Sequence, residues 1–480
     1  MSMKVNALTR RLIAVVPIVV LVALLALDIA IFGSDSILGP SQVALISAAG
    51  VCVLLSTLLY KTPWKAFEKA IGGNVGEVAG AILILLLIGA ISGTWTMSGI
   101  VPALICYGLK IISPKVFLLT ACVICAVVSL LTGSSWTTIA TIGVALIGIG
   151  RAEGFSDAMT AGAIISGAYF GDKISPLSDT TVLASSISRV NLFDHIRYML
   201  FTTGPSILIT LVIFTVMGLL HPAAAQAQMT EYAQVLHSHF NITPWLMLVP
   251  VLTGIMIWRK LPAIAVLALS ALAAAVMALL FQPDILGTIG SAVTEGTRGK
   301  VLFTGVVETV YNTVSIETGN PEVNALVTSR GMLGMLNTVF LIICAMCFGG
   351  CMKASGMIED IAGMLIPLTR SRTGLVGTTV ASGTALNGIV SDQYLAIILT
   401  SDIYRESFEK GGYESRLLSR SVEDSATVTS PLFPWSSCGM TQATILSVPT
   451  LAYAPFCFFN IISPLMSILI AAIGWKIVKR

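Results

Sequence analysis

The sequence predicts an all-α polytopic membrane protein with about 10–13 transmembrane segments in two inverted-topology repeats. Three observations predict this fold class. Of the 480 residues, 55% are hydrophobic and only 11% are charged, whereas soluble domains carry about 25% charged residues. The apolar residues form runs long enough to cross a bilayer, which takes about 20 residues. Polar stretches interrupt these runs at corresponding places in the two halves of the chain.

The same numbers exclude several classes of function. A net charge of +3, spread along the chain, does not favour nucleic acid. The composition also argues against an enzyme, and the nine cysteines are interpreted as small packing residues rather than a redox or metal site. An intramembrane protease would need paired aspartates or a Ser–His pair in the spans. The four histidines (His195, His221, His237 and His239) all lie outside the apolar runs, so a Ser–His pair in the spans is not expected and a protease is disfavoured.

Residues 1–76 are expected to hold two transmembrane helices, over 12–32 and 42–60, and an interfacial helix at 64–74. Basic residues favour the cytoplasmic side of a membrane. Because they precede the first run and follow the second, the N-terminus and the segment 61–76 are placed in the cytoplasm. These basic residues are Lys4, Arg10, Arg11, Lys61, Lys65 and Lys69, and the intervening loop has Asp35 and no Lys or Arg.

Residues 77–220 form the predicted first core repeat. The run 77–112 has a polar interruption at 92–99, which predicts one broken span or two short ones. The runs 116–131 and 135–149 flank a polar tip, LTGSSW (131–136), as two spans or as a re-entrant hairpin. A broken helix follows over 160–187, with its break at 171–181, and 199–220 completes the repeat.

Residues 221–331 are predicted as a connector with a transmembrane pair (245–258 and 264–281) and a long external segment. The second core repeat covers 332–480, with a polar tip at 386–393 and a broken helix whose break lies at 424–437. The segment 405–420 is interpreted as a cytoplasmic loop. Basic residues at the end of the chain place the C-terminus in the cytoplasm, and these are Lys476, Lys479 and Arg480.

The internal repeat depends on short matches at one offset. LTGSSW (131–136) corresponds to LNGIVS (386–391), and SPL (175–177) corresponds to SPL (430–432), both 255 residues apart. The pair Ser98-Gly99 corresponds to Ser355-Gly356. Because the first half begins inside and the second begins outside, the repeat is inverted. Inverted repeats with paired discontinuous helices indicate a secondary transporter whose site lies near the bilayer midplane.

The first break has residues suited to binding a cation. Charges at membrane depth cost at least ~2.5–3.5 kcal/mol each, so they need a partner or a use. Carboxylate and hydroxyl oxygens are ligands for hard cations. A buried carboxylate can bind either H⁺ or Na⁺, and this competition suffices for an exchanger. We expect a Na⁺ site at Asp172 and Asp179; the alternative is that both only cap helix ends. The candidate ligands are Asp172, Ser175, Asp179, Thr180 and Thr181.

The second half offers a corresponding set. Its candidate ligands are Asp392 at the polar tip and Asp424, Thr427 and Ser430 at the second break. Glu423 is an accessory candidate that could equally form a surface pair with Arg420. Lys353 could neutralise a site carboxylate or extend to the membrane interface. Ser134, Ser135 and Trp435 complete the accessory set, with Trp435 a packing residue or a wall of the site.

Three stretches resemble the NhaC-type Na⁺/H⁺ antiporters, a family of the ion transporter superfamily that includes malate/lactate exchangers. They are GAYFGDKISPLSDTT (167–181), NGIVSDQYLAIIL (387–399) and LSRSVEDSATVTSPLFPWSSCG (418–439). The resemblance covers most of the chain from the third span onwards. It implies a multi-pass secondary transporter of the bacterial cytoplasmic membrane and leaves a homodimer open. It also points to Asp172, Ser175, Asp179, Thr180, Asp392, Glu423, Asp424, Thr427 and Ser430.

Two departures from the family pattern concern the substrate. Val182 stands where an Asn usually follows DTT, and PWSS (434–437) stands where PWNT is usual. Na⁺/H⁺ antiport is the first hypothesis, because no obvious anion-binding Arg lies in a span. The alternative is Na⁺- or H⁺-coupled transport of a small organic anion or amino acid, with half-helix N-termini holding its carboxylate. Na⁺ is expected as the transported or coupling ion, and no cofactor is expected.

Overall fold

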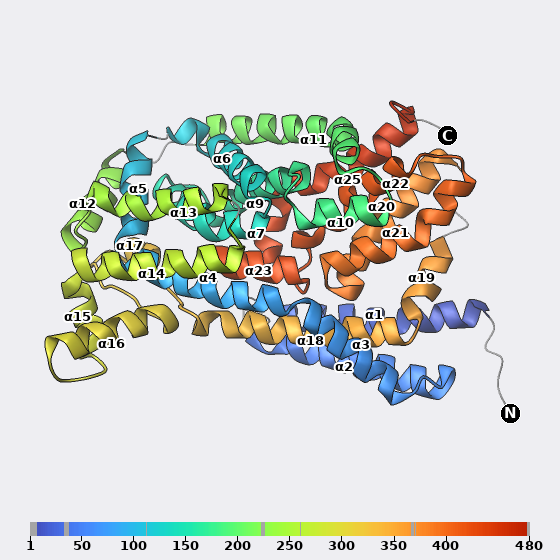
Figure 1. Cartoon of the computed structure of the whole chain (residues 1–480), viewed down its shortest axis with the longest axis horizontal. Helices are drawn as coiled ribbons and strands as arrows, with labels where there is room; N and C mark the ends of the chain where they lie inside the picture. Colours follow the sequence, from blue (N-terminus) through green and yellow to red (C-terminus); the bar gives the residue numbers. More distant parts are fainter. Residues whose placement is uncertain are drawn as a thin grey trace.

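The computed structural model describes residues 7–32, 38–111, 113–221, 226–259, 261–365, 369 and 371–477. Within these ranges the chain is helical almost throughout, and its β-structure is an isolated bridge between Val314 and Ser329. Most long helices run along the long axis of the molecule (Figure 1). The prediction of an all-α fold is therefore confirmed.

The described helices include seven stretches that are long and apolar enough to cross a membrane. Three further helix pairs are bent by 68°, 95° and 56° at short breaks, and counting each as one span gives ten. Ten is the lower end of the predicted range. The seven stretches are Thr9–Phe32, Pro40–Tyr60, Pro114–Thr132, Ser135–Ala152, Leu192–Leu220, Ala263–Phe281 and Leu333–Ala354.

The N-terminal helices form one layer with a helix from the second half of the chain (Figure 1). Asn74 Nδ2 donates to Met346 O at 3.5 Å across this layer. The expected interfacial segment is helical, whereas Lys4 and Asp35 lie outside the described residues. The helices of the layer are α1 (Ala7–Phe32), α2 (Pro40–Leu55), α3 (Trp64–Glu77) and α18 (Leu336–Ala354).

The polar interruption expected at 92–99 is narrower in the structure. Helix α4 (Ala79–Met97) continues through most of it, and α5 (Ile100–Ile111) starts three residues later. The bend of 68° falls at Ser98 and Gly99. Gly99 has φ +83°, which a residue without a Cβ adopts at little cost.

The first core repeat is built on close contact between α6 (Phe117–Thr132) and α9 (Asp157–Ile174). A Cβ at Gly167 would lie 2.0 Å from Cys122 O, so the two backbones touch where α9 has no side chain. This repeat also has α7 (Ser135–Thr138), α8 (Val144–Ala152), α10 (Asp179–Ile187) and α11 (Leu192–Leu220).

The connector contributes helices at the end of the molecule opposite the start of α1 (Figure 1). The segment predicted as external contains short helices, which the sequence had left open. The connector helices are α12 (Gln226–His239), α13 (Leu248–Trp258), α14 (Ala263–Phe281), α15 (Pro283–Ser291), α16 (Arg298–Tyr311) and α17 (Pro321–Leu326).

The prediction of a cytoplasmic loop over 405–420 is wrong for most of that segment. Helix α21 (Gln393–Lys410) runs to residue 410, and α22 (Ser415–Val422) begins five residues later. Leu417 and Leu418 are buried because α22 packs against α11, α20 and α21. The remaining helices of this half are α19 (Met357–Leu365), α20 (Arg372–Val390), α23 (Ser437–Leu446), α24 (Thr450–Tyr453) and α25 (Phe458–Ile473).

The two halves share local features at a nearly constant separation. The left-handed residues Gly133 and Ser391 are 258 residues apart, and the helix-capping serines Ser178 and Ser436 are separated by the same number. This register is three residues longer than the one that the SPL letters suggest. The inverted orientation of the halves stays a prediction.

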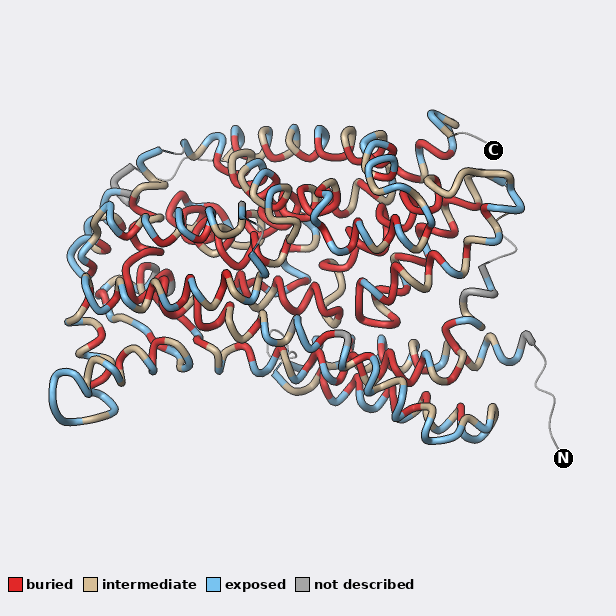
Figure 2. The backbone as a smooth tube through the Cα atoms, in the orientation of Figure 1, coloured by how far each residue is buried: buried red, intermediate tan, exposed pale blue. Residues whose placement is uncertain are grey.

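Burial is concentrated in the middle of the bundle, and exposed positions follow the outer helices (Figure 2). Many exposed side chains are large and apolar, including Leu27, Leu208 and Leu272, which are 54%, 63% and 64% exposed. Apolar side chains on the outside of a bundle suit a hydrocarbon solvent. Polar side chains, in contrast, gather in the interior around the helix breaks.

Candidate ion-binding site

The interior is built from two tips and two breaks. The tips are at Gly133-Ser134, between α6 and α7, and at Ser391-Asp392, between α20 and α21. The breaks are at 175–178, between α9 and α10, and at 423–436, between α22 and α23. Hydrogen bonds join the first tip to the end of α9 and the second tip to the second break, and an ion pair joins the end of α9 to the second break.

Asp172 is held at the first tip. It is 6% exposed, and its Oδ2 accepts from Ser135 Oγ at 2.7 Å and from Ser135 N at 3.2 Å. Asp172 lies within the last turns of α9, so it is not part of the unwound segment as predicted. The carboxylate faces the first residue of α7, where free backbone N–H groups favour negative charge.

The hydroxyl groups of the first break mostly satisfy the break itself. Ser175 Oγ donates to Leu130 O at 2.8 Å, and Thr181 Oγ1 donates to Lys173 O at 3.0 Å. The hydroxyls of Thr180 and Ser178 lie 3.0 Å apart. Asp179 is exposed in the first turn of α10, whereas Asp172 is buried. A Na⁺ site shared by these two carboxylates stays a prediction.

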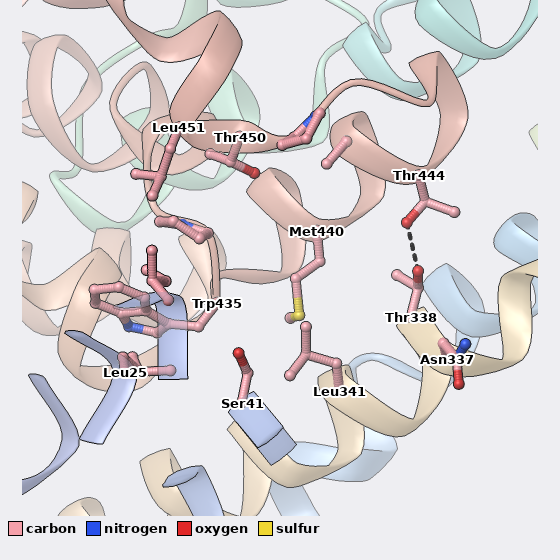
Figure 3. Close-up of a pocket in the computed structure, with 14 residues that line it drawn as sticks. Leu25, Ser41, Asn337, Thr338, Leu341, Trp435, Met440, Thr444, Thr450 and Leu451 are labelled. Carbon is pink, nitrogen blue, oxygen red and sulfur yellow. Dashed lines mark hydrogen bonds between the residues drawn. The ribbon is translucent and has the colours of Figure 1, made fainter. Parts of the chain in front are cut away.

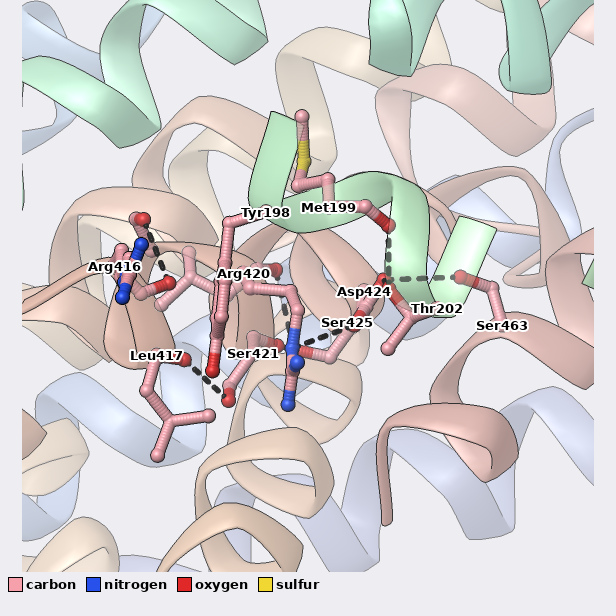
Figure 4. Close-up of polar contacts among 12 residues, drawn as sticks. Tyr198, Met199, Thr202, Arg416, Leu417, Arg420, Ser421, Asp424, Ser425 and Ser463 are labelled. Atoms are coloured by element: carbon pink, nitrogen blue, oxygen red, sulfur yellow. Dashed lines mark hydrogen bonds and ion pairs between the residues drawn. The ribbon is translucent and has the colours of Figure 1, made fainter. Parts of the chain in front are cut away.

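A buried ion pair connects the two breaks. Lys173 Nζ donates to Asp424 Oδ1 and, at 2.9 Å, to Ser463 Oγ, and both charged side chains are fully buried. Thr202 Oγ1 donates to the same carboxylate oxygen at 3.0 Å, and Ser463 Oγ lies 3.3 Å from it (Figure 4). Removing one partner of a buried pair costs about 3–5 kcal/mol, so this contact fixes α9 against the second break.

Arg420 is the second buried cation. Its guanidinium lies 4.6 Å from the ring centre of Tyr198, and its Nε is 3.9 Å from Asp424 Oδ2 (Figure 4). None of its three nitrogens makes a hydrogen bond to a described residue. The sequence did not foresee a buried Arg in this region, and the alternative in which Arg420 pairs with Glu423 at the surface is wrong. The cause is the burial of α22, whose residues 415–420 belong to the segment expected to be a cytoplasmic loop.

Glu423 differs from the other carboxylates of this region. It is fully buried, and neither Oε atom has a hydrogen-bond partner among the described residues. It opens a π-helical turn, Glu423–Thr427, and Thr427 Oγ1 at the other end of the turn is buried without a partner as well. Buried polar groups are normally hydrogen-bonded, and π turns are frequent at functional sites.

The second tip is tied to the second break. Asp392 is almost fully buried; its Oδ1 caps α21 by accepting from Leu395 N at 3.0 Å, and its Oδ2 accepts from Ser437 Oγ at 3.2 Å. Ser437 is one of the two serines of PWSS (434–437), the segment that departs from the family pattern. One residue of this segment therefore contacts the Asp392 carboxylate of the candidate site. Ser430 Oγ donates to Gln393 Oε1 at 3.2 Å and closes the same junction.

The accessory candidates have local structural contacts. Ser134 Oγ caps α7 by accepting from Thr137 N at 3.2 Å. Trp435 Nε1 donates to Gly388 O at 2.7 Å, and its ring lines an apolar pocket between the N-terminal layer and α23–α24 (Figure 3). Lys353 is exposed at the end of α18 and forms no ion pair with a described residue, so it does not neutralise a buried carboxylate.

Sequence reasoning missed His195 as well as the roles of Lys173 and Arg420. His195 is fully buried, and its Nδ1 lies 2.8 Å from Ser419 Oγ. The expectation that all histidines lie outside the spans failed because α11 starts seven residues before the apolar run. A usable signal was the i,i+4 spacing of Arg420 and Asp424, which places opposite charges on one helix face.

A polytopic helical bundle in which paired helix breaks meet around buried charges is a secondary transporter. The chain belongs to the Na⁺/H⁺ antiporter family, whose model matches residues 3–183 and 167–475. It is 36% identical to the Na(+)/H(+) antiporter NhaC of Bacillus subtilis (strain 168) over 425 residues, covering 88% of this chain and 90% of the relative. The segment common to both family matches, 167–183, contains Asp172 and the first break.

Other relatives are named for different exchanges. The chain is 35% identical to the Malate-2H(+)/Na(+)-lactate antiporter of Bacillus subtilis (strain 168) over 427 residues, covering 88% of this chain and 87% of the relative. It is 30% identical to the Arginine/ornithine antiporter ArcD of Halobacterium salinarum over 471 residues, covering 97% and 93%. Antiport is common to these names, whereas the exchanged solutes differ.

Proposed function

We propose that this protein exchanges Na⁺ for H⁺ as a secondary active antiporter of the bacterial cytoplasmic membrane, with both termini in the cytoplasm. The observation that carries the proposal is the gathering of three buried carboxylates at the two helix breaks, Asp172, Glu423 and Asp424. Family membership and the names of relatives support the same activity. Na⁺ is the transported ion, and no other cofactor is part of the proposal.

The mechanism follows from the cost of a buried charge. A carboxylate away from water is stable only when it is protonated, hydrogen-bonded or paired with a cation. A site carboxylate that loses its proton therefore gains affinity for Na⁺, and Na⁺ binding in turn expels the proton. If the breaks open alternately to the two sides of the membrane, this competition couples opposite movements of the two ions.

Purified protein in liposomes with an internal pH dye tests the activity. We expect Na⁺, added across an imposed pH gradient, to move protons in the direction opposite to Na⁺. Asp172→Asn is expected to weaken this response, because it removes one negative charge beside the site. Glu406→Gln is the control, since that carboxylate is exposed at the end of α21. A wild-type protein that moves no protons in response to Na⁺ would refute the proposal.

A second candidate function is exchange of a small organic anion or amino acid coupled to Na⁺ or H⁺. The observation that favours it is the buried guanidinium of Arg420, whose nitrogens have no hydrogen-bond partner among the described residues. A guanidinium binds a carboxylate through two parallel hydrogen bonds. The solutes named for two relatives, malate and arginine among them, carry carboxylates.

The two candidates are separated by supplying solutes. Proton movement that requires malate, lactate or an amino acid, and that Na⁺ alone does not produce, would favour the second candidate. Loss of that response in Arg420→Gln, with Na⁺/H⁺ exchange absent throughout, would support Arg420 as the carboxylate-binding group. A full response to Na⁺ without any organic solute would exclude an obligatory organic substrate.

A further inference from the structure

The three carboxylates at the breaks differ in what stabilises their charge. Asp172 accepts two hydrogen bonds from Ser135. Asp424 accepts from Lys173, Thr202 and Ser463. Glu423 accepts none from the described residues, although it is as deeply buried as Asp424. Glu423 is therefore the carboxylate of the three for which neither oxygen has a hydrogen-bond partner among the described residues.

The charged groups near Glu423 do not compensate its charge. The groups that interact with it electrostatically are Lys173, Asp172 and Asp424, and two of these are carboxylates. The ammonium of Lys173 is already engaged with Asp424 and Ser463. The remaining buried cation, Arg420, is held over Tyr198 and beside Asp424. Both buried cations thus pair with Asp424, and Glu423 forms no ion pair or hydrogen bond with a described residue.

The turn that carries Glu423 is held rigidly from both sides. Asn387 Nδ2 donates to Ala426 O and Asn460 Nδ2 donates to Val428 O, each at 2.7 Å. These amides satisfy backbone carbonyls that the broken helix leaves unpaired. On the α20 side, a Cβ at Gly383 would lie 2.4 Å from Ser425 Oγ, so α20 fits closely against the turn. The unpartnered oxygens thus lie in a fixed framework.

Thr427 supplies a second unpartnered oxygen on the same turn. Its hydroxyl interacts with Glu423, four residues earlier, but the two groups do not reach hydrogen-bond geometry. No three His, Cys, Asp or Glu side chains of the described residues converge on one point, as a divalent or transition-metal site would require. One carboxylate with neutral oxygens suits a hard monovalent cation.

We propose that Glu423 and Thr427 bind the transported Na⁺, and that a proton occupies the Glu423 carboxylate when Na⁺ is absent. The Lys173–Asp424 pair then remains formed throughout the cycle and positions the turn rather than exchanging ions. Asp172 contributes negative potential that favours the cation. This inference rests on the proposed Na⁺/H⁺ exchange and assigns it to a residue that the sequence ranked only as accessory.

The test measures Na⁺ binding directly on purified full-length protein in detergent. Thermal unfolding is compared in NaCl and in N-methylglucamine chloride at equal ionic strength, and proton release on addition of Na⁺ is followed in weak buffer with a pH dye. A ligand that binds only the folded state raises the unfolding temperature. We expect wild type to show both responses, and Glu423→Gln to lose both while its unfolding temperature without Na⁺ is unchanged or higher.

Thr427→Val keeps the carboxylate and tests the site independently of charge. We expect at least a fivefold higher Na⁺ concentration at half-maximal stabilisation. Glu406→Gln, on the exposed end of α21, should match wild type. If either Glu423→Gln or Thr427→Val responds to Na⁺ as wild type does, the assignment is overturned. If wild type itself shows no Na⁺-dependent stabilisation or proton release, the proposed exchange fails first and the inference fails with it.

Discussion

The buried ion pair between Lys173 and Asp424 allows a quantitative test of the structure. Asp424→Asn removes the only carboxylate within 4.0 Å of either buried cation among the described residues, because Lys173 and Arg420 both approach Asp424. Lys173→Met removes one cation and leaves Asp424 with Arg420 at 3.9 Å and with hydrogen bonds from Thr202 and Ser463. The two single substitutions therefore should not cost the same.

The magnitudes follow from the groups left behind. An uncompensated buried charge costs about 3–5 kcal/mol, so Asp424→Asn, which strands two cations, should lie at the upper end of that range. Lys173→Met should cost about 1–3 kcal/mol, because hydrogen bonds to the remaining carboxylate persist. The double variant should be less destabilised than the sum of the single variants by at least about 2 kcal/mol, since it leaves one cation instead of two.

The measurement is reversible unfolding in mixed detergent micelles for the four proteins of this double-mutant cycle. Far-ultraviolet circular dichroism would report the loss of helix. Each variant should elute as folded protein before unfolding begins. Additive costs within about 0.5 kcal/mol would show that the two side chains do not interact. Equal costs for the two single variants would contradict the role given to Arg420.

The remaining predictions concern packing, a hydrogen bond and pH. Gly167→Ala should destabilise the fold by several kcal/mol or prevent folding, because the new Cβ would meet Cys122 O at 2.0 Å; Gly254→Ala, with nothing within 4 Å, is the control in the same unfolding assay and should be neutral or stabilising. Ser135→Ala should lower the free energy of unfolding by about 1.5–3 kcal/mol, because it removes the hydroxyl that donates to Asp172, whereas Ser134→Gly, at the cap, should cost only a few tenths; equal effects would contradict the importance of the Asp172 contact. Burial raises the pKa of Glu153, just beyond the end of α8, to about 8 from 4.5. Folding therefore favours the protonated form of Glu153. The contribution of Glu153 to the free energy of unfolding is fully present below about pH 4.5 and is lost as the pH rises to about 8. Glu153→Gln should flatten that part of the stability-versus-pH curve, and an unchanged slope would refute the interpretation.

Much of the architecture could be predicted from local sequence. The apolar runs predict the membrane helices because their length and composition alone decide the cost of insertion. The SPL segments predict both breaks because proline disfavours continuation of a helix. The predicted boundaries of the breaks were less accurate. Asp172 was expected in the first break but lies inside α9, because a helix can include a polar side chain whose partner comes from another element.

The burial of α22 was the main failure of the sequence reading. LSRSVEDSAT (418–427) begins one of the family motifs, and the sequence left open whether Glu423 serves the site or pairs with Arg420 at the membrane edge. In the structure α22 is enclosed by α20 and α21, which precede it in the chain, and by α11, which is about 200 residues away in sequence. No local pattern reports this enclosure, because burial depends on which other helices pack around the segment.

The sequence by itself determined the class of protein, the positions of the helix breaks and the residue types available there, because hydropathy, proline and helix length act locally. Only the tertiary structure decided which charges are paired. Lys173 and Asp424 are 251 residues apart in the chain. Glu423 directly precedes Asp424 and is therefore almost equally far from Lys173 in sequence. The folded chain gives Asp424 a cation, whereas Glu423 forms no ion pair with a residue that the structure describes. That difference arises from long-range packing, and it selects the carboxylate that we propose for the ion.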